Sequence, residues 1–403
     1  SGTGSDGMRG VRAIKESGGI IMVQDEESAR FDGMPRSAIS TGMADFILPP
    51  GEMPRQLTAY TDHPEQTRSA RSDTILTDED GLTRIFAMLR DHHKIDFTYY
   101  KPSTVVRRIE RRMTVNHINE LRDYVKFLES YPRELTTLYR ELLIGVTSFF
   151  RDAEVFKDLA ENYLPKLIKN VTSEPIRFWI AGCSTGEEAY TLAILCRECM
   201  DAIGKNRDVK IFATDVDNDA ILFAGNGIYP ESIAADLSPA YLTKYFVKHD
   251  DSYKISRSIR EMVVFAQHNL IKDPPFTNIE LISCRNLLIY LQPVLQLRVL
   301  DYFNFSLNPN GLLLLGHSET TGEMADHFEP LNHKWKLYKS KGLARDPLAR
   351  HELSASRSRP ATATRTSYTA IPRGLRRFEE ERILDRLLDA LSGEYVPLTM
   401  MVN

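Results

Sequence analysis

Between residues 151 and 340, short apolar segments alternate with segments of helical periodicity, and this alternation constrains the fold more than any other feature of the sequence. The apolar segments are IRFWIAG (176–182), VKIFATD (209–215), VVFAQHN (263–269), IELISCRN (279–286) and GLLLLGHSE (311–319). Segments that stay apolar throughout are typical of parallel strands covered on both faces by helices. The pattern predicts an α/β fold with a doubly wound, Rossmann-like sheet that binds its ligand at the carboxyl ends of the strands. Residues 238–262 interrupt the alternation and predict a small β insertion.

The rest of the chain divides into smaller segments by composition. Residues 1–59 carry an α/β pattern that is short for an independent core, and the polar residues 60–80 are expected to form a linker. Residues 81–150 have the apolar periodicity of helices, which predicts a small helical domain before the α/β domain. Residues 341–373 have the composition of a disordered linker, and residues 374–403 predict an amphipathic helix that leads into a truncated further domain.

Charge and cysteine content exclude several classes of protein. A formal net charge of -4 argues against general binding of nucleic acid, and the absence of an apolar run of about 18 residues argues against a membrane-embedded chain. Four cysteines are too few for a disulfide framework and are typical of a reducing compartment, so we expect a cytoplasmic protein. Cys196 and Cys199 form a C-x-x-C pair inside a helical pattern, without a second pair of ligands, and we expect core thiols rather than a metal site.

Two chemistries compete for the glycine-rich turn IAGCSTGEEAY at residues 180–190. In an elbow serine hydrolase Ser184 would be the nucleophile, but Glu187 and Glu188 would then oppose the negative charge that builds up on an acyl oxygen. The next strand ends at Asp215, where doubly wound folds hold an acid against ribose hydroxyls. Since the glutamates would also repel a pyrophosphate, the turn favours a ribose-bearing cofactor with positive charge, S-adenosylmethionine. The hydrolase is the less favoured alternative.

Several motifs follow one another in order along residues 81–340. They are VTSFFRD (146–152), AGCSTGEEAY (181–190), FATDVDNDAI (212–221), GIYP (227–230), HNL (268–270), CRNLLIYL (284–291) and NGLLLLGHSE (310–319). Through these motifs the segment resembles the chemotaxis-receptor glutamate methyltransferases of the CheR type. The resemblance implies an enzyme that transfers a methyl group from S-adenosylmethionine to glutamate side chains of receptors, as part of sensory adaptation.

The resemblance also implies a set of cofactor contacts in this chain. Arg151 would pair with the carboxylate of the cofactor, Glu187 would lie beside its ammonium, and Asp215 would accept from the ribose hydroxyls. The implied contacts are Thr147, Arg151, Glu187, Asp215, Asn269, Leu270, Arg285 and Asn286. Gly145 departs from the family pattern, because family members often have Asn at this position.

Methyl transfer to glutamate needs no general base, because a carboxyl with a reference pKa of about 4.3 is already ionised at pH 7. Catalysis is then expected from positioning and from partial removal of water, with a cation or donor that orients the incoming carboxylate. Arg285 and Tyr290 are the candidates for that donor, and a structural role for Tyr290 stays open.

By resemblance, a basic face meets the acidic, coiled-coil methylation region of the receptor, and an ordinary solvated face is the alternative. That face comprises Arg107, Arg108, Arg111 and Arg112.

Residues 1–59 resemble the C-terminal end of the CheB-type receptor methylesterases, through GTGSDGMRG, GGIIMVQDEESARFDGMPRSAI and FILPP. By that match Asp6 is the acid of a Ser-His-Asp triad that lacks its serine and histidine here, so no esterase activity is expected. The chain is therefore expected to be part of a methylesterase-methyltransferase fusion, with sensory or kinase domains as further partners. The alternative to an active methyltransferase is a catalytically weak scaffold that binds the cofactor.

Overall fold

The structure is a computed structural model that describes residues 7–16, 19–41, 43–61, 75–143, 145–172 and 175–342. Asp6 and the expected helix within residues 374–403 lie outside the described residues.

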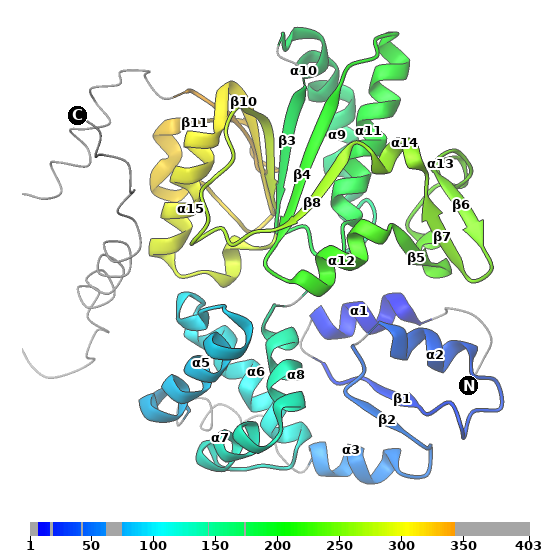
Figure 1. Ribbon diagram of the computed structural model, residues 1–403, viewed down its shortest axis with the longest axis vertical. Helices are drawn as coiled ribbons and strands as arrows, with labels where there is room; N and C mark the ends of the chain where they lie inside the picture. Colours follow the sequence, from blue (N-terminus) through cyan, green and yellow to red (C-terminus); the bar gives the residue numbers. More distant parts are fainter. Residues whose placement is uncertain are drawn as a thin grey trace, which may run out of the picture. The chain divides into compact units, whose positions relative to one another are not determined.

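A seven-stranded sheet forms the centre of the α/β domain, in the order β11-β12-β10-β9-β3-β4-β8 (Figure 1). The strands are β3 (Ile176–Ala181), β4 (Val209–Asp215), β8 (Val263–Gln267), β9 (Ile279–Cys284), β10 (Leu307–Leu315), β11 (Phe328–Asn332) and β12 (Leu337–Ser340). The first five pair in parallel, whereas β12 is antiparallel to both β10 and β11. The predicted mostly parallel, Rossmann-like sheet is confirmed.

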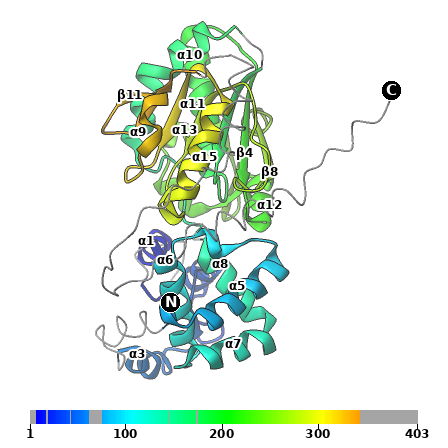
Figure 2. The same cartoon turned by 90° about the vertical axis from the view of Figure 1, so that its left-hand side faces the viewer.

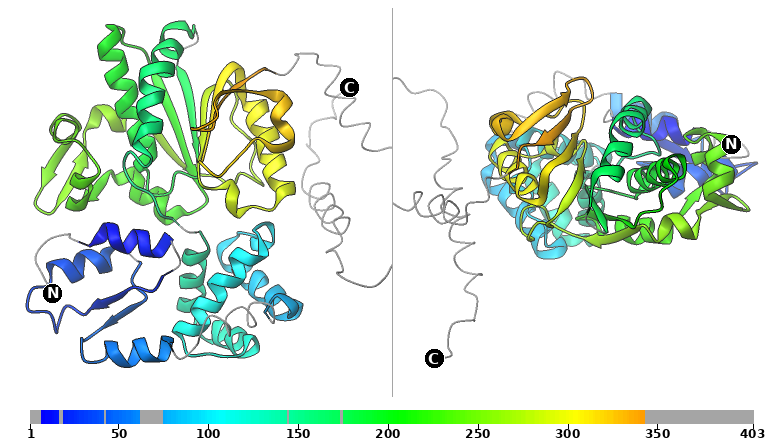
Figure 3. Two further views of the ribbon diagram at one scale, coloured as in Figure 1. Left: turned by 180° about the vertical axis from the view of Figure 1, so that it is seen from behind. Right: turned by 90° about the horizontal axis from the view of Figure 1, so that it is seen from above.

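Helices cover both faces of this sheet. They are α9 (Ala153–Asp158), α10 (Leu164–Asn170), α11 (Glu187–Ile203), α12 (Asn218–Asn226) and α15 (Pro293–Ser306), and they can be followed in Figures 2 and 3. Successive side chains of a strand point to opposite faces, so β3 serves two cores. Phe178 and Ile180 pack in the cluster that contains the buried residues of α11, whereas Trp179 packs in the cluster that contains those of α15. Cys196 and Cys199 are free, buried thiols in α11, as predicted.

A three-stranded antiparallel sheet, in the order β5-β7-β6, forms the β insertion. Its strands are β5 (Ile228–Pro230), β6 (Phe246–His249) and β7 (Ser252–Ile255), together with the short helices α13 (Pro239–Tyr245) and α14 (Arg257–Arg260). Strand β5 lies before the expected segment 238–262. The sequence does not predict it, because three residues are too few to show a strand pattern.

Four helices form the helical domain: α5 (Glu79–His93), α6 (Pro102–Val115), α7 (Leu121–Ser130) and α8 (Pro132–Leu143). Asp78 caps α5 by accepting from the N–H of Gly81 at 3.0 Å. The segment before α6 pairs with the α/β domain: Lys101 N–H donates to Tyr290 O at 2.8 Å, and Gln292 N–H donates to Tyr99 O at 3.1 Å. These bonds attach the helical domain to the loop that follows β9.

The first described segment contains α1 (Met8–Glu16), β1 (Met22–Gln24), α2 (Gly33–Ser40), β2 (Phe46–Leu48) and α3 (Met53–Thr61). Strands β1 and β2 pair in parallel, and the described part of this segment has a small buried cluster of Ile21, Val23 and Ala38, besides the buried Met8. So small a core agrees with the expectation that the segment is too short to fold by itself.

A buried ion-pair network joins this segment to the helical domain. The fully buried carboxylate of Asp45 binds Lys15 Nζ at 3.1 Å and also binds the guanidinium of Arg111. Lys15 further lies 3.5 Å from Glu141, and Arg112 pairs with Glu141 at 3.3 Å. Breaking such a network is costly, because the remaining charges stay buried without a partner.

We therefore expect Asp45→Ala to lower the free energy of unfolding by about 3–5 kcal/mol, because it leaves Lys15 and Arg111 short of a counter-charge. Urea unfolding measures this loss. The matched control is Glu129→Ala, which removes the exposed pair with Arg84 and should cost no more than about 1 kcal/mol. Equal losses in the two variants would contradict the importance of the network.

Candidate functional site

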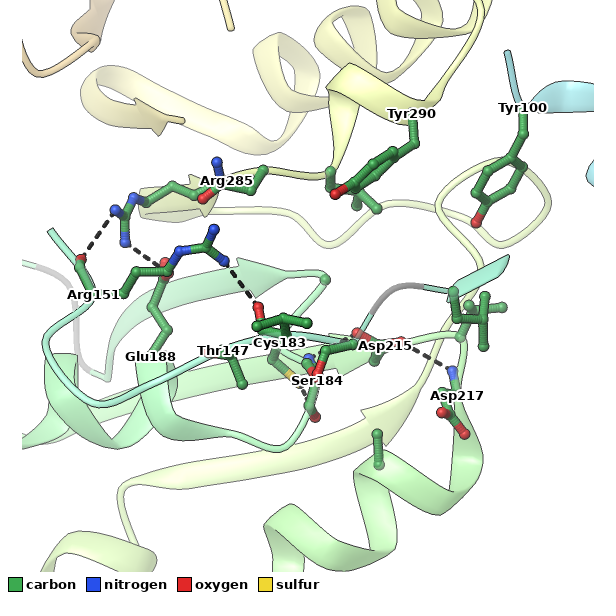
Figure 4. A pocket seen from close by; sticks show the side chains of 18 residues that line it. Tyr100, Thr147, Arg151, Cys183, Ser184, Glu188, Asp215, Asp217, Arg285 and Tyr290 are labelled. Atoms are coloured by element: carbon green, nitrogen blue, oxygen red, sulfur yellow. Dashed lines mark hydrogen bonds and ion pairs between the residues drawn. The ribbon is translucent and has the colours of Figure 1, made fainter. Parts of the chain in front are cut away.

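A cleft of about 840 Å³, including its open mouth, lies at the carboxyl ends of β3, β4 and β9 (Figure 4). Its walls come from the turn after β3, the end of β4, the loop after β9 and residues 145–151. The helical domain adds Tyr100 and Leu143. The cleft therefore occupies the position that the parallel sheet predicts for a ligand.

The turn after β3 needs glycine for reasons that the structure makes explicit. Gly186 has φ +90°, and a Cβ there would lie 2.8 Å from the Cβ of Ala224. Gly182 has φ +78°, and a Cβ would lie 2.9 Å from a methyl group of Leu287. The turn can thus adopt this left-handed backbone and pack against its neighbours only because both positions lack a side chain.

Ser184 lies inside this turn with φ +48°, and its Oγ donates to the carbonyl oxygen of Gly145 at 3.3 Å. A hydroxyl that donates to a backbone carbonyl has no base to activate it, which does not favour the hydrolase alternative. An ideal Cβ on Gly145 would lie 3.2 Å from the same Oγ, so the position that departs from the family pattern lies against this turn.

Asp215 connects the turn to the end of β4. Its carboxylate accepts from the N–H of Ser184 at 2.8 Å and from the N–H of Asp217 at 3.0 Å. Desolvation nevertheless raises the pKa of this carboxyl above its ordinary value, although these hydrogen bonds act in the opposite direction. Asp215 is therefore held in one orientation in the cleft wall, as an acceptor at the expected place.

Arg285 crosses the far side of the cleft with its charge already paired (Figure 4). Its Nη1 donates to Glu188 Oε2 at 2.9 Å, and its Nη2 donates to a carboxylate oxygen of Asp152. Ser283 Oγ donates to the other oxygen of Glu188. This pairing corrects the expectation that Arg285 orients an incoming carboxylate, because two protein carboxylates already hold its guanidinium.

The other predicted site residues fall into two groups. Thr147, Arg151, Asn286 and Tyr290 line the cleft with Asp215 and Arg285, whereas Glu187, Asn269 and Leu270 do not line it. Glu187 is 2% exposed and accepts from Thr185 Oγ1 at 2.7 Å. Asn269 holds a turn instead, because its Oδ1 accepts from the N–H of Ile271 at 2.9 Å.

The contacts implied by the resemblance omit Glu188 and Tyr100, and both residues line the cleft. Glu188 faces the cleft where Glu187 was expected, and the two are adjacent at the start of a helix whose rotation the sequence does not reveal. Tyr100 enters from the helical domain, and Figure 4 shows its hydroxyl and that of Tyr290 pointing into the cleft. No motif near Tyr100 signals this position, since it depends on the pairing of residues 99–101 with residues 290–292.

The structure also corrects the expected basic docking face. Arg107 is exposed, but Arg108, Arg111 and Arg112 are only 3%, 8% and 7% exposed. Arg111 and Arg112 take part in the buried network with Asp45, Glu134 and Glu141, which the sequence could not place near them. Arg108 is buried as well, and its Nε, like the Nε of Arg111, has no hydrogen-bond partner among the described residues.

Comparison with known families matches three parts of the chain. Residues 145–337 match the family described as CheR methyltransferase, SAM binding domain, and residues 80–143 match CheR methyltransferase, all-alpha domain. Residues 1–57 match CheB methylesterase.

Individual relatives agree with these matches. A chemotaxis protein methyltransferase of Borreliella burgdorferi is 33% identical over 251 residues, which cover 60% of this chain and 88% of that protein. Chemotaxis protein methyltransferase 2 of Vibrio cholerae is 30% identical over 281 residues, covering 67% of this chain and 94% of that protein. An uncharacterised 104.1 kDa protein of Rhodobacter capsulatus is 39% identical over 400 residues, and the chain spans 42% of that relative's length.

The cofactor of the matched domain is S-adenosylmethionine, and the cleft residues fit it. This cofactor combines ribose hydroxyls, a cationic sulfur and an amino acid end with both charges. The cleft offers Asp215 as an acceptor, Glu188 as a nearby carboxylate and Arg151 as a cation. In the described ranges, no group of three or more His, Cys, Asp or Glu side chains could hold a metal ion, and no helix has the length and apolar character needed to cross a membrane.

We expect Asp215→Asn to raise the dissociation constant of S-adenosylmethionine about tenfold, because a charged acceptor is lost from the cleft. The melting temperature should also fall, because both carboxylate oxygens accept from backbone N–H groups and the NH2 of Asn would face one of these donors. Calorimetry measures the binding and a thermal scan measures the stability. The control Asp219→Asn alters an exposed carboxylate that pairs with Arg140, and its dissociation constant should stay within about twofold of the wild type.

Proposed function

Because the chain belongs to the CheR family of chemotaxis protein methyltransferases, we propose that it methylates glutamate side chains in the helical methylation region of a chemoreceptor. The observation that carries the proposal is the cleft at the strand ends, whose wall combines residues from both matched CheR domains. S-adenosylmethionine supplies an activated methyl group when bound. Thr147, Arg151, Asp215 and Asn286 are the residues that would hold it.

The glutamate of the substrate is ionised at neutral pH and needs no general base. The main task of the protein is therefore to position this carboxylate against the methyl donor. Tyr290 lies in the cleft wall with its hydroxyl directed inward, where it can donate to a carboxylate oxygen (Figure 4). The turn after β3 and the loop after β9 form opposite walls, so they exclude part of the water around the reacting groups.

Arg108 supports the proposal as the cation that orients the substrate carboxylate. Burial lowers its pKa, and the neighbouring Arg107 and Arg111 lower it further, while Glu141 and Tyr290 act in the opposite direction. Tyr290, which lines the cleft, is thus one of the groups that act on the pKa of Arg108, whereas Arg108 itself does not line the cleft. A buried guanidinium with an unpartnered Nε gains most from a new carboxylate, because its desolvation has already occurred.

A cytoplasmic location is part of the same proposal. The receptor region to be methylated would be an acidic coiled coil outside the membrane, and the reaction needs no nucleic acid or metal. The cysteines of the chain, Cys183, Cys196, Cys199 and Cys284, are all free and buried, as suits a reducing compartment.

The direct test is to incubate the chain with a soluble receptor cytoplasmic fragment and S-adenosylmethionine labelled in its methyl group. Mass spectrometry of the fragment should then find methyl esters on glutamate side chains. Cofactor binding without any transfer to candidate receptors would contradict the proposed enzyme and support the scaffold alternative.

Paired arginine variants test how the substrate is oriented. Arg108→Ala should lower kcat/KM for the receptor fragment by about tenfold or more, because a charge-assisted hydrogen bond is lost, while the dissociation constant of S-adenosylmethionine stays unchanged. The exposed neighbour Arg107 provides the control, and Arg107→Ala should change kcat/KM by no more than about twofold. An Arg108→Ala variant that methylates at the rate of the wild type would exclude this role.

A further inference from the structure

Glu319 joins the two loops that follow β9 and β10. The strands are parallel neighbours with Leu315 opposite Cys284, so the turns after them leave the sheet side by side. The carboxylate of Glu319 accepts from the N–H of Gly316 at 2.6 Å, the N–H of Asn286 at 3.1 Å and the N–H of Ile289 at 3.3 Å. One side chain therefore satisfies backbone donors of both loops.

The surroundings of this carboxylate are closely packed. Glu319 is 4% exposed, and Asn286 has φ +58°, a left-handed conformation that brings its N–H to the carboxylate. A Cβ on Gly316 would lie 2.6 Å from Glu319 Oε2 and 2.7 Å from Asn286 N, so glycine is required there. Burial raises the pKa of Glu319, and the backbone N–H groups oppose that shift. Burying a carboxylate costs free energy, so its presence here indicates that the loop needs the hydrogen bonds it accepts.

The loop that Glu319 holds contributes residues to the wall of the cleft. Asn286 lines it directly, and Ile289 lies in the short 3-10 helix η4 (Leu288–Tyr290), which ends at Tyr290. We propose that Glu319 is a positioning residue for the methyltransferase: by accepting from the backbone of Asn286 and Ile289, it sets the place of Asn286 and Tyr290 in the cleft. This inference rests on the proposed function for the role of Tyr290, but its effect on the cofactor can be measured separately.

A carboxylate suits this position better than an amide does. The three N–H groups converge on the two oxygens of Glu319, and Gln would replace one oxygen with an NH2 group that faces a donor. Glu319→Gln keeps the size and shape of the side chain, yet leaves at least one buried backbone donor without an acceptor. The unsatisfied N–H group raises the free energy of this loop conformation, so we expect the loop to shift. The loss of a purely apolar contact would not have this effect.

The experiment compares Glu319→Gln with Glu280→Gln by calorimetric titration with S-adenosylhomocysteine, the demethylated cofactor. Glu280 is a matched control, because it is 8% exposed on β9, accepts from Asn308 Nδ2 at 2.7 Å and does not line the cleft. We expect the dissociation constant to rise about tenfold in Glu319→Gln and to stay within about twofold in Glu280→Gln. Thermal scans show whether both variants are folded at the temperature of the titration.

A second variant keeps the test decisive if Glu319→Gln does not fold. Gly316→Ala keeps the Glu319 side chain, but the new Cβ would lie 2.6 Å from its Oε2 and 2.7 Å from Asn286 N, so one of these groups must shift and binding should weaken in the same way. Wild-type affinity in a folded Glu319→Gln or Gly316→Ala variant would overturn the proposal. Absence of receptor methylation by the wild type would contradict the proposed function instead, because this titration uses no receptor.

Discussion

The parallel pairing of β3 with β4 on one side and with β9 on the other is the constraint on which the site depends. Parallel strands end at the same edge of a sheet, so the segments after β3, β4 and β9 are brought together although they are far apart in the chain. The cleft is the space between them. Its geometry is stable because the strands are buried on both faces, in two separate clusters of apolar side chains.

Backbone donors and a guanidinium at this edge are buried or partly buried, and acidic side chains accept hydrogen bonds from them. Asp215 accepts from the turn after β3, and Glu319 accepts from the loop after β9. Glu188 holds Arg285 from the first turn of α11. These carboxylates fix the shape of the cleft, and Asp215 and Glu188 also line it. The same side chain can thus serve the structure and the ligand, which explains why acids gather at an edge that binds a partly cationic cofactor.

The need to pair buried charges also explains how the methylesterase-type segment is joined to the methyltransferase. Its own core is small, and the network around Asp45 connects it to α6 and α8. Arg111 and Arg112 are buried in ion pairs of that network, so they do not lie on a surface that a receptor could contact. Arg108 is buried as well, and burial lowers its pKa.

The sequence by itself determined the sheet, the glycine turn and the acid at the end of β4. Each of these signals is local: continuous apolar segments indicate buried strands, and glycine is favoured where the backbone is left-handed and a Cβ would clash. Tertiary structure decided which side chains meet. The rotation of α11 put Glu188 rather than Glu187 in the cleft, and a partner 66 residues away buried Arg111. Tyr100 lies in the site because residues 99–101 pair with a loop much later in the chain. For example, Gln292 Nε2 donates a hydrogen bond to the carbonyl oxygen of Tyr100, and the two residues are 192 positions apart in the sequence. Periodicity reports which residues are apolar, whereas the choice of a charged partner depends on distances that exist only after the chain has folded.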